Sequence, residues 1–268
     1  PVVHVGEFGT VSGAWERILP ISASDTIFVT PWWQQIWWSH FGSGSDLRIL
    51  SVSEGGLVLG IAPLMIVNGE VKFVSSPDLC DYSDFVVASG KEEVFYRSII
   101  GFFKENGWNK VRLNSIPDGS PTLTHLPQLA ENKKYSIKIE EADVAPICSL
   151  PSSWERYLQT LSKKNRHEIR RKIRNIGNHS TYSRYVFDPI RDDIDECFTD
   201  FIRLHKGSSL AKTQFMTPGR EDFFFDMFSE LAQRDELRLE FLILEDKRVA
   251  CCVGFDYADS YLLYNSGY

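Results

Sequence analysis

Two segments of the chain begin alike and continue alike, and this repetition is the strongest constraint on the fold. The first opens with TPWWQQIWWSHF at Thr30, and the second opens with TPGREDFFFDMFSEL at Thr217. Thr-Pro is typical of a helix start, with Thr as the cap and Pro at the first helical position. The sequence therefore predicts two helices that begin in the same way and are both rich in aromatic residues.

Each predicted helix leads into three strands. We expect strands at 47–53, 57–66 and 71–75 in the first copy, and at 237–244, 248–257 and 260–264 in the second. Short turns with Gly, Asp or Lys separate the first two strands of each copy. Helix–hairpin units are common, so chance remains an alternative, but we favour duplication. The predicted fold class is α/β with mixed sheets, in two tandem units at 1–145 and 146–268.

The first copy extends further than the second. After its third strand we expect a fourth strand at DYSDFVV, a helix at 92–106, and a fifth strand at WNKVRLNSI. Residues 117–134 are rich in Pro and polar residues and are expected to form a loop, followed by a strand-like stretch at YSIKIEEADVAPICSL. A further helix is expected at 190–206. If the copies are equivalent, the second lacks its last helix and at least one strand.

Composition excludes several classes of protein. The five cysteines include no C-x-x-C pair, which argues against a disulfide framework or a zinc ribbon and favours a reducing compartment, the cytoplasm. His167-Glu168 lacks the second histidine of a zinc motif, so we expect no metal site. No apolar run reaches the length of a membrane span. A pI near 5.4 argues against a general binder of polyanions.

The stretch LSKKNRHEIRRKIRN at 161–175 concentrates positive charge. Between positions 163 and 174, seven Lys or Arg accompany one Glu, a net +6 in a chain that carries −7, so the other residues together carry −13. Ile169, Ile173 and Ile176 predict one narrow buried stripe on this helix. The surrounding cations fit a solvated face, a site for phosphate or carboxylate, or a nucleic-acid surface.

Several stretches together resemble a known family. They are SWERYLQTLSKKNRHEIRRKIRN, TPWWQQIWWSHFG, GLVLGIAPL, DYSDFVV and RLEFLILEDKRVACCVGFDYADSYLLYNSGY. They resemble the acetyltransferase-like domain of the CelD/BcsL group in the GNAT superfamily, which is related to the FemAB aminoacyl transferases. FemAB relatives contain two GNAT-like units in tandem. The resemblance implies two mixed sheets flanked by helices, and transfer of an acyl group from acyl-coenzyme A to an amine or hydroxyl.

The resemblance also implies where the chemistry lies. The thioester arm would lie along SYLLYNSGY, and the pyrophosphate loop would follow Tyr268. The hydroxyl of Tyr264 or Tyr268 would protonate the leaving thiolate, with aromatic packing of an edge strand as the alternative. His205 is the candidate base, or else a histidine that complements the dipole at a helix C-terminus.

Two further groups of residues are candidates for binding. Asp81, Tyr82 and Asp84 would bind a cationic acceptor, or they form a capped turn. The basic helix supplies candidates for contact with cofactor phosphates, with His167 as a substrate contact; the phosphate candidates are Arg166, Arg170 and Arg171.

Three functions remain open from the sequence. The first is an acyl-coenzyme A-dependent N- or O-acyltransferase acting on a sugar or cell-envelope precursor, so the partner would be a small-molecule or glycan-precursor acceptor. The second is a FemAB-like transferase that uses aminoacyl-tRNA, for which the basic helix would meet the tRNA phosphates. The third is a binding module without catalytic activity. The sequence leaves the oligomeric state open.

Overall fold

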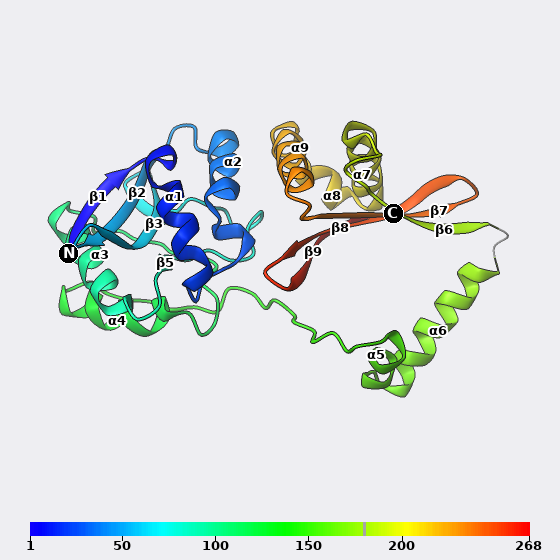
Figure 1. The fold of residues 1–268 in the computed structure, drawn as a ribbon, viewed down its shortest axis with the longest axis horizontal. Helices are drawn as coiled ribbons and strands as arrows, with labels where there is room; N and C mark the ends of the chain where they lie inside the picture. The colour runs from blue at the N-terminus through cyan, green and yellow to red at the C-terminus, as the bar shows by residue number, and fades with distance from the viewer. Residues whose placement is uncertain (179–180) are drawn as a thin grey trace. The chain divides into compact units, whose positions relative to one another are not determined.

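A computed structural model describes residues 1–178 and 181–268. The chain divides into two compact units, Pro1–Val144 and Ala145–Tyr268. Each unit contains one sheet with helices packed on it, which is the predicted α/β class (Figure 1).

The sheet of the N-terminal unit is an antiparallel meander with one added short strand. Its strands run in the order β1 (Val2–Gly6), β2 (Asp46–Glu54), β3 (Leu57–Val67) and β4 (Glu70–Phe73), and β5 (Val86–Val87) pairs with β3. Helices α1 (Phe8–Ile18) and α2 (Pro31–Phe41) connect β1 to β2. Thr30 caps α2 as predicted, because its hydroxyl accepts a hydrogen bond from the Trp33 N–H at 3.3 Å.

Aromatic side chains build the core of this unit. Phe85, Phe95, Tyr96 and Phe103 are buried together between the sheet and two later helices, α3 (Glu92–Glu105) and α4 (Pro121–Asn132). The rings of Phe85, Phe95 and Tyr96 meet edge to face, with the centroids of Phe85 and Phe95 5.7 Å apart.

The C-terminal unit shares with the N-terminal unit the order of one strand, a group of helices and a three-stranded meander. Its sheet runs β6 (Tyr182–Val186), β7 (Leu237–Leu244), β8 (Lys247–Tyr257) and β9 (Ser260–Gly267), and every neighbouring pair is antiparallel. Helices α7 (Ile194–Ser208), α8 (Leu210–Phe215) and α9 (Pro218–Gln233) connect β6 to β7. They lie on one side of the sheet (Figure 1), where a cluster of buried phenylalanines fills the interface: Phe201, Phe223, Phe224, Phe228 and Phe241.

Three local predictions are wrong. The stretch 117–134 contains helix α4 instead of a loop, because Ser120 caps it and Pro121 occupies its first turn. The expected fifth strand is reduced to one parallel bridge between Val71 and Val111. Residues 135–150 form no strand and are mostly exposed.

The expected helix at 190–206 is shifted. Helix α7 begins at Ile194, where Asp193 accepts a hydrogen bond from the Asp195 N–H at 2.8 Å, and it ends at Ser208. Ile190 lies before the helix and is exposed. The side-chain cap therefore sets the start of the helix.

Two helices precede β6, and the second of them is less buried than the sequence predicted. These helices are α5 (Trp154–Thr160) and α6 (Lys163–Gly177), and α6 contains the basic run. The isoleucine stripe was expected to be buried, but no residue of α6 is buried, and Ile173 is 47% exposed. Ile169 and Ile176 are half-buried, so the predicted stripe is only partly covered.

Candidate functional site

Strand β9 contains an irregularity at the position where the resemblance places the chemistry. The register between β8 and β9 shifts between Val253 and Gly254, because Val253 pairs with Asn265 whereas Gly254 pairs with Leu263. Tyr264 is therefore an extra residue on β9, which makes a β-bulge. Bulges interrupt backbone pairing, re-aim side chains, and are enriched beside active sites.

The end of β9 packs directly on the end of α7. Gly267 is buried, and a Cβ atom on this residue would lie 2.4 Å from the backbone nitrogen of His205 and 2.5 Å from the carbonyl carbon of Leu204. Only glycine permits this approach of strand and helix. The close contact brings the side chains of α7 and α8 next to those of β9.

His205 is the buried imidazole of this region. Its side chain is on α7, only 1% of the residue is exposed, and its ring contacts Phe201 and Phe215. Burial, followed by the positive charge of Lys212, lowers the pKa of His205 to about 4, although a hydrogen bond with Asn265 opposes the shift. The imidazole is therefore neutral at pH 7.

The two ring nitrogens of His205 differ. Nδ1 is buried and has no hydrogen-bond partner among the described residues, which assigns the contact with Asn265 to Nε2. An open lone pair on a neutral imidazole is what a general base requires. The burial of the ring keeps it from direct contact with a substrate in this conformation, so its role as a base stays a proposal.

Lys212 and Ser208 tie helix to strand around His205. The Nζ atom of Lys212 donates a hydrogen bond to the backbone carbonyl of Ser266. Ser208 Oγ accepts a hydrogen bond from the Tyr268 N–H at 2.8 Å. Lys212, Ser208, Asn265 and Ser266 were not predicted as site residues, because they meet only across the register of the folded sheet.

The two tyrosines predicted for catalysis lie differently. The ring of Tyr264 packs on Phe255, 4.8 Å away, and on Phe224, 5.7 Å away. Tyr268 is exposed. The bulged strand therefore places Tyr264, which is half-buried, against aromatic side chains, and leaves Tyr268 more exposed to solvent.

The three residues of the DYSD turn point in different directions. Asp81 is exposed as a residue, but partial burial of its carboxyl group raises the pKa of that group, with a further contribution from Asp143. Tyr82 is half-buried, with its ring centroid 6.2 Å from that of Phe28. Asp84 is fully buried. The predicted acceptor site is therefore not one cluster facing solvent.

Asp84 joins three parts of the N-terminal unit. Its carboxylate accepts hydrogen bonds from Ser24 Oγ at 2.9 Å, from Ser120 Oγ at 2.5 Å, and from Thr122 Oγ1. A backbone N–H from Phe85 completes the set at 2.8 Å. Burial raises the pKa of Asp84, and the hydroxyl donors oppose the shift. This geometry supports a structural role, because every acceptor site is already used inside the core.

The predicted phosphate contacts on α6 have unequal partners. Arg171 is held by Glu168 through two hydrogen bonds of 2.8 and 2.7 Å. Arg166 donates to the Leu158 carbonyl at 3.4 Å. Arg170 is exposed and has no hydrogen bond or ion pair in the described part of the chain. His167 is exposed and lines a shallow hollow at the start of the helix with Lys163 and Lys164.

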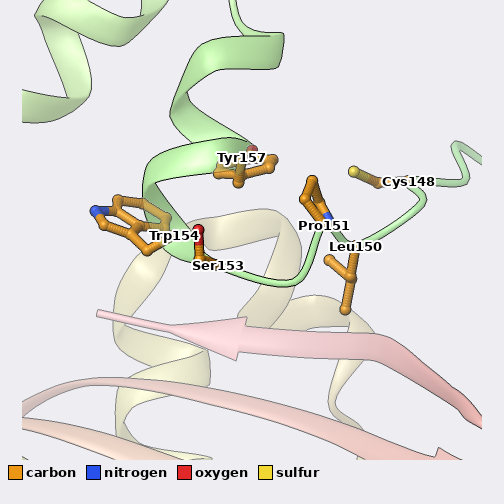
Figure 2. A pocket seen from close by; sticks show the side chains of 6 residues that line it. All are labelled: Cys148, Leu150, Pro151, Ser153, Trp154 and Tyr157. Atoms are coloured by element: carbon orange, nitrogen blue, oxygen red, sulfur yellow. The ribbon is translucent and has the colours of Figure 1, made fainter.

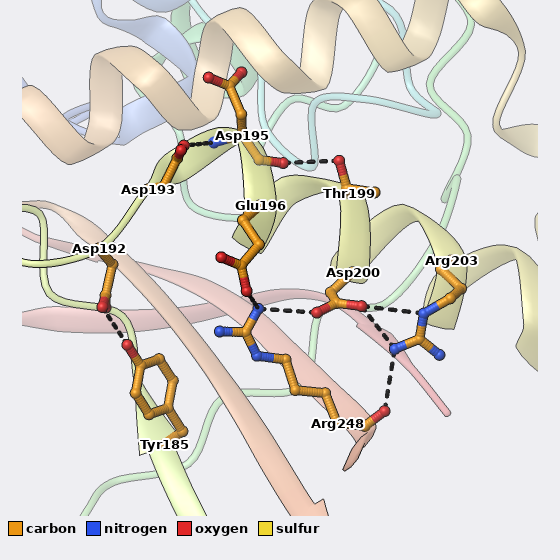
Figure 3. A network of polar contacts seen from close by, with 9 residues as sticks. All are labelled: Tyr185, Asp192, Asp193, Asp195, Glu196, Thr199, Asp200, Arg203 and Arg248. Atoms are coloured by element: carbon orange, nitrogen blue, oxygen red, sulfur yellow. Dashed lines mark hydrogen bonds and ion pairs between the residues drawn. The ribbon is translucent and has the colours of Figure 1, made fainter. Parts of the chain in front are cut away.

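A polar network fixes α7 on the sheet (Figure 3). The Arg248 guanidinium on β8 reaches Asp200 on α7 at 2.9 Å and Glu196 at 3.5 Å. It also lies over the rings of Phe241, 4.6 Å away, and Tyr185, 5.3 Å away. This network was not predicted from the sequence, and it holds the helix that carries His205.

A family model matches most of the C-terminal unit. Residues 163–268 match the family model of the acetyltransferase (GNAT) domain. The match begins at α6 and runs to the end of β9, so it contains the bulged strand and His205. It confirms the predicted relation to the GNAT superfamily, whereas the narrower CelD/BcsL assignment stays a prediction.

A solved structure shares the fold of the chain. The crystal structure of FemX is similar with a TM-score of 0.54 and 14% sequence identity, over 91% of this chain and 58% of the FemX chain. The chain thus spans less than two thirds of the length of FemX, and the likeness concerns the fold. No curated protein sequence matches the chain.

In residues 1–178 and 181–268 there is no group of three or more His, Cys, Asp or Glu arranged to hold a metal ion. No helix within these residues is both long and apolar enough to cross a membrane.

Proposed function

We propose that the C-terminal unit transfers an acyl group from acyl-coenzyme A to an amine or hydroxyl on a sugar or cell-envelope precursor. The observation that carries the proposal is the GNAT match of residues 163–268, which includes a strand bulged at Tyr264. Among the described strands, β9 is an edge strand, so its outer backbone groups are open to hydrogen bonds from a ligand with amide groups. We place the activity in the cytoplasm, since all five cysteines are free.

The proposed roles follow from the geometry around β9. Tyr268, exposed at the end of this strand, would donate a proton to the leaving thiolate. His205 would accept the proton of the attacking group, which requires the end of β9 to move away from α7 because the ring is buried. Arg170 is the best remaining candidate on α6 for a coenzyme phosphate, because it is exposed and unpaired among the described residues.

Coenzyme A binding tests the proposal directly. A ligand that binds only the folded chain at about 100 times its Kd stabilises it by about 2.7 kcal/mol. We expect acetyl-coenzyme A to raise the thermal midpoint, and Arg170→Gln to reduce the rise relative to Arg97→Gln, an exposed arginine on α3. The absence of a shift at millimolar coenzyme A would refute the donor assignment. A shift without any acyl transfer would favour the binding module.

The second candidate is a transferase that uses aminoacyl-tRNA. The net charge of +6 between positions 163 and 174 favours it. We then expect tRNA binding that persists at ~200 mM salt and weakens in Arg170→Glu and Arg171→Glu. Binding that is unchanged by both substitutions excludes this candidate.

A further inference from the structure

The stretch from Ile147 to Ile176 exposes apolar and cationic side chains together. In α6, the stripe of Ile169, Ile173 and Ile176 runs along one side of a helix in which no residue is buried. Arg166 and Lys172 flank the stripe by helical spacing. Long basic side chains beside an apolar stripe can lie along it while their charges reach outward.

The segment before α6 adds a second apolar surface. Ile147, Leu150 and Trp154 are all exposed. Leu150 and Trp154 line an open hollow of about 410 Å³ together with Tyr157, and Figure 2 shows these side chains around it. The rings of Trp154 and Tyr157 stack with their centroids 5.5 Å apart. Trp and Tyr are the residues that proteins place at the boundary between lipid and water.

The charge of α6 is available for a partner. Glu168 binds Arg171 and lies 4.0 Å from Lys172, whereas no ion pair of Lys163, Lys164, Arg170 or Arg174 occurs in the described part of the chain. The rest of the chain carries a net charge of −13, so the net positive charge is confined to this segment, although other Lys and Arg residues lie elsewhere. An anionic surface would be attracted to α6 and repelled elsewhere, which favours a single orientation.

We propose that residues 147–176 dock on an anionic phospholipid surface. A lipid interface accepts isoleucine, leucine and tryptophan among its acyl chains and accepts Lys and Arg at its phosphates. A nucleic acid matches the charge but offers no apolar surface for the isoleucine stripe. The docking lies in the interface, does not require a spanning helix, and does not depend on which reaction the chain catalyses.

Vesicle binding by the whole 268-residue chain tests the proposal. We expect co-sedimentation with phosphatidylcholine vesicles that contain phosphatidylglycerol, and no binding to phosphatidylcholine alone. Arg170→Gln with Arg174→Gln should weaken binding roughly 30-fold, since each cation near an anionic surface contributes about a factor of five. Ile173→Ser should weaken it roughly tenfold, because its side chain no longer enters the interface.

A matched control removes the same charge elsewhere. Arg97→Gln with Arg191→Gln replaces two exposed arginines outside α6, so binding should stay within about twofold of the wild type. Vesicle binding that responds equally to both double variants would overturn the proposal. So would tRNA binding without vesicle binding, which would make α6 a nucleic-acid surface.

An internal partner for the stripe is the remaining rival. The sheet of the C-terminal unit also exposes apolar side chains, among them Tyr182 and Leu263. If the stripe packs inside the protein, Ile173→Ser lowers the thermal midpoint in the absence of vesicles by several degrees. Under the proposal, the thermal midpoint of this variant equals that of the wild type, and only vesicle binding changes.

Discussion

Replacing Arg248 tests whether the polar network fixes helix α7 on the sheet. The Arg248 side chain is 17% exposed and that of Asp200 is 26% exposed, so solvent screens their contact only partly. Loss of a charge-assisted hydrogen bond costs about 1.5–3 kcal/mol. Loss of the cation–π contacts with Phe241 and Tyr185 adds about 0.5–1 kcal/mol, whereas Glu196 is mostly exposed and adds little. We therefore expect Arg248→Met to lower the free energy of unfolding by about 2–4 kcal/mol.

Hydrogen exchange locates the effect. A loss of about 2 kcal/mol in the free energy of unfolding should speed amide hydrogen exchange in α7 and β8 about 30-fold, where exchange requires the unit to unfold. Arg203→Met is the matched control, because Arg203 also binds Asp200, at 2.7 Å, but its side chain is 56% exposed. We expect it to cost less than about 1 kcal/mol. Equal losses of stability in Arg203→Met and Arg248→Met would refute the argument that the buried arginine contributes more than the exposed one.

The pH dependence provides a second check. Burial raises the pKa of Asp200, but the hydrogen bonds and charges of Arg203 and Arg248 outweigh it, so the net pKa lies below its usual value. A lowered folded pKa stabilises the protein above the unfolded value of about 3.9, and this stability is lost as the pH falls through the folded pKa. The difference in the free energy of unfolding between wild type and Arg248→Met should therefore become smaller on acidification below about pH 4. A difference that stays constant with pH would contradict the assignment of the lowered pKa of Asp200 to its contact with Arg248.

Three further predictions concern the core and the close contact at β9. The folded pKa of His205 is about 4 and its unfolded pKa about 6.5, so the unfolded chain binds more protons between these pH values. Moving from pH 7 to pH 5 should therefore lower the free energy of unfolding by about 2 kcal/mol, as measured by urea unfolding. This loss should be absent in His205→Gln. Asp84→Ala leaves three buried hydroxyl groups without their acceptor and should destabilise the N-terminal unit by at least about 3 kcal/mol in thermal unfolding, with Asp81→Ala as an exposed control close to neutral. Gly267→Ala drives a methyl group into the α7 backbone and should lower the thermal midpoint, whereas Gly219→Ala, with nothing within 4 Å, should not.

Patterns that are local in the sequence predicted the elements well. Both Thr-Pro helices and both strand meanders are present, because Pro at the first helical position and short turns act over a few residues. Thr30 caps its helix as predicted, whereas the side chain of Thr217 makes no cap hydrogen bond. Helix α4 was missed because its Pro and polar content resembles a loop. Pro121 is tolerated in the first turn, and the signal was Ser120 as its cap.

The site was harder to predict because its contacts are non-local. Lys212 meets Ser266, and Arg248 meets Asp200, across about fifty residues of chain. No periodic pattern encodes such pairs, since they depend on the register of β8 and β9. His205 was found from the resemblance, yet its burial depends on Gly267, whose closeness to α7 only the fold reveals.

The two units share features of strand pairing that were not part of the sequence comparison. In each unit, a strand that precedes the compared segments, β1 or β6, pairs with the first strand of the meander. The first hairpin of each unit also has a register shift two residue pairs from its turn, at Val52/Ser53 and at Leu242/Ile243. Two unrelated helix–hairpin units need share neither the preceding strand nor the register shift. The presence of both features in each unit therefore favours duplication of one ancestral unit.

One irregularity is not shared between the two units. The pairing of β8 with β9 has a bulge at Tyr264, whereas the pairing of β3 with β4 keeps its register throughout. An irregularity present in both copies belongs to the common fold, and one confined to the copy with the GNAT match has a local cause. A bulge interrupts backbone pairing between strands, so the difference between the copies favours β9 over β4 as the strand that would meet the proposed acyl donor.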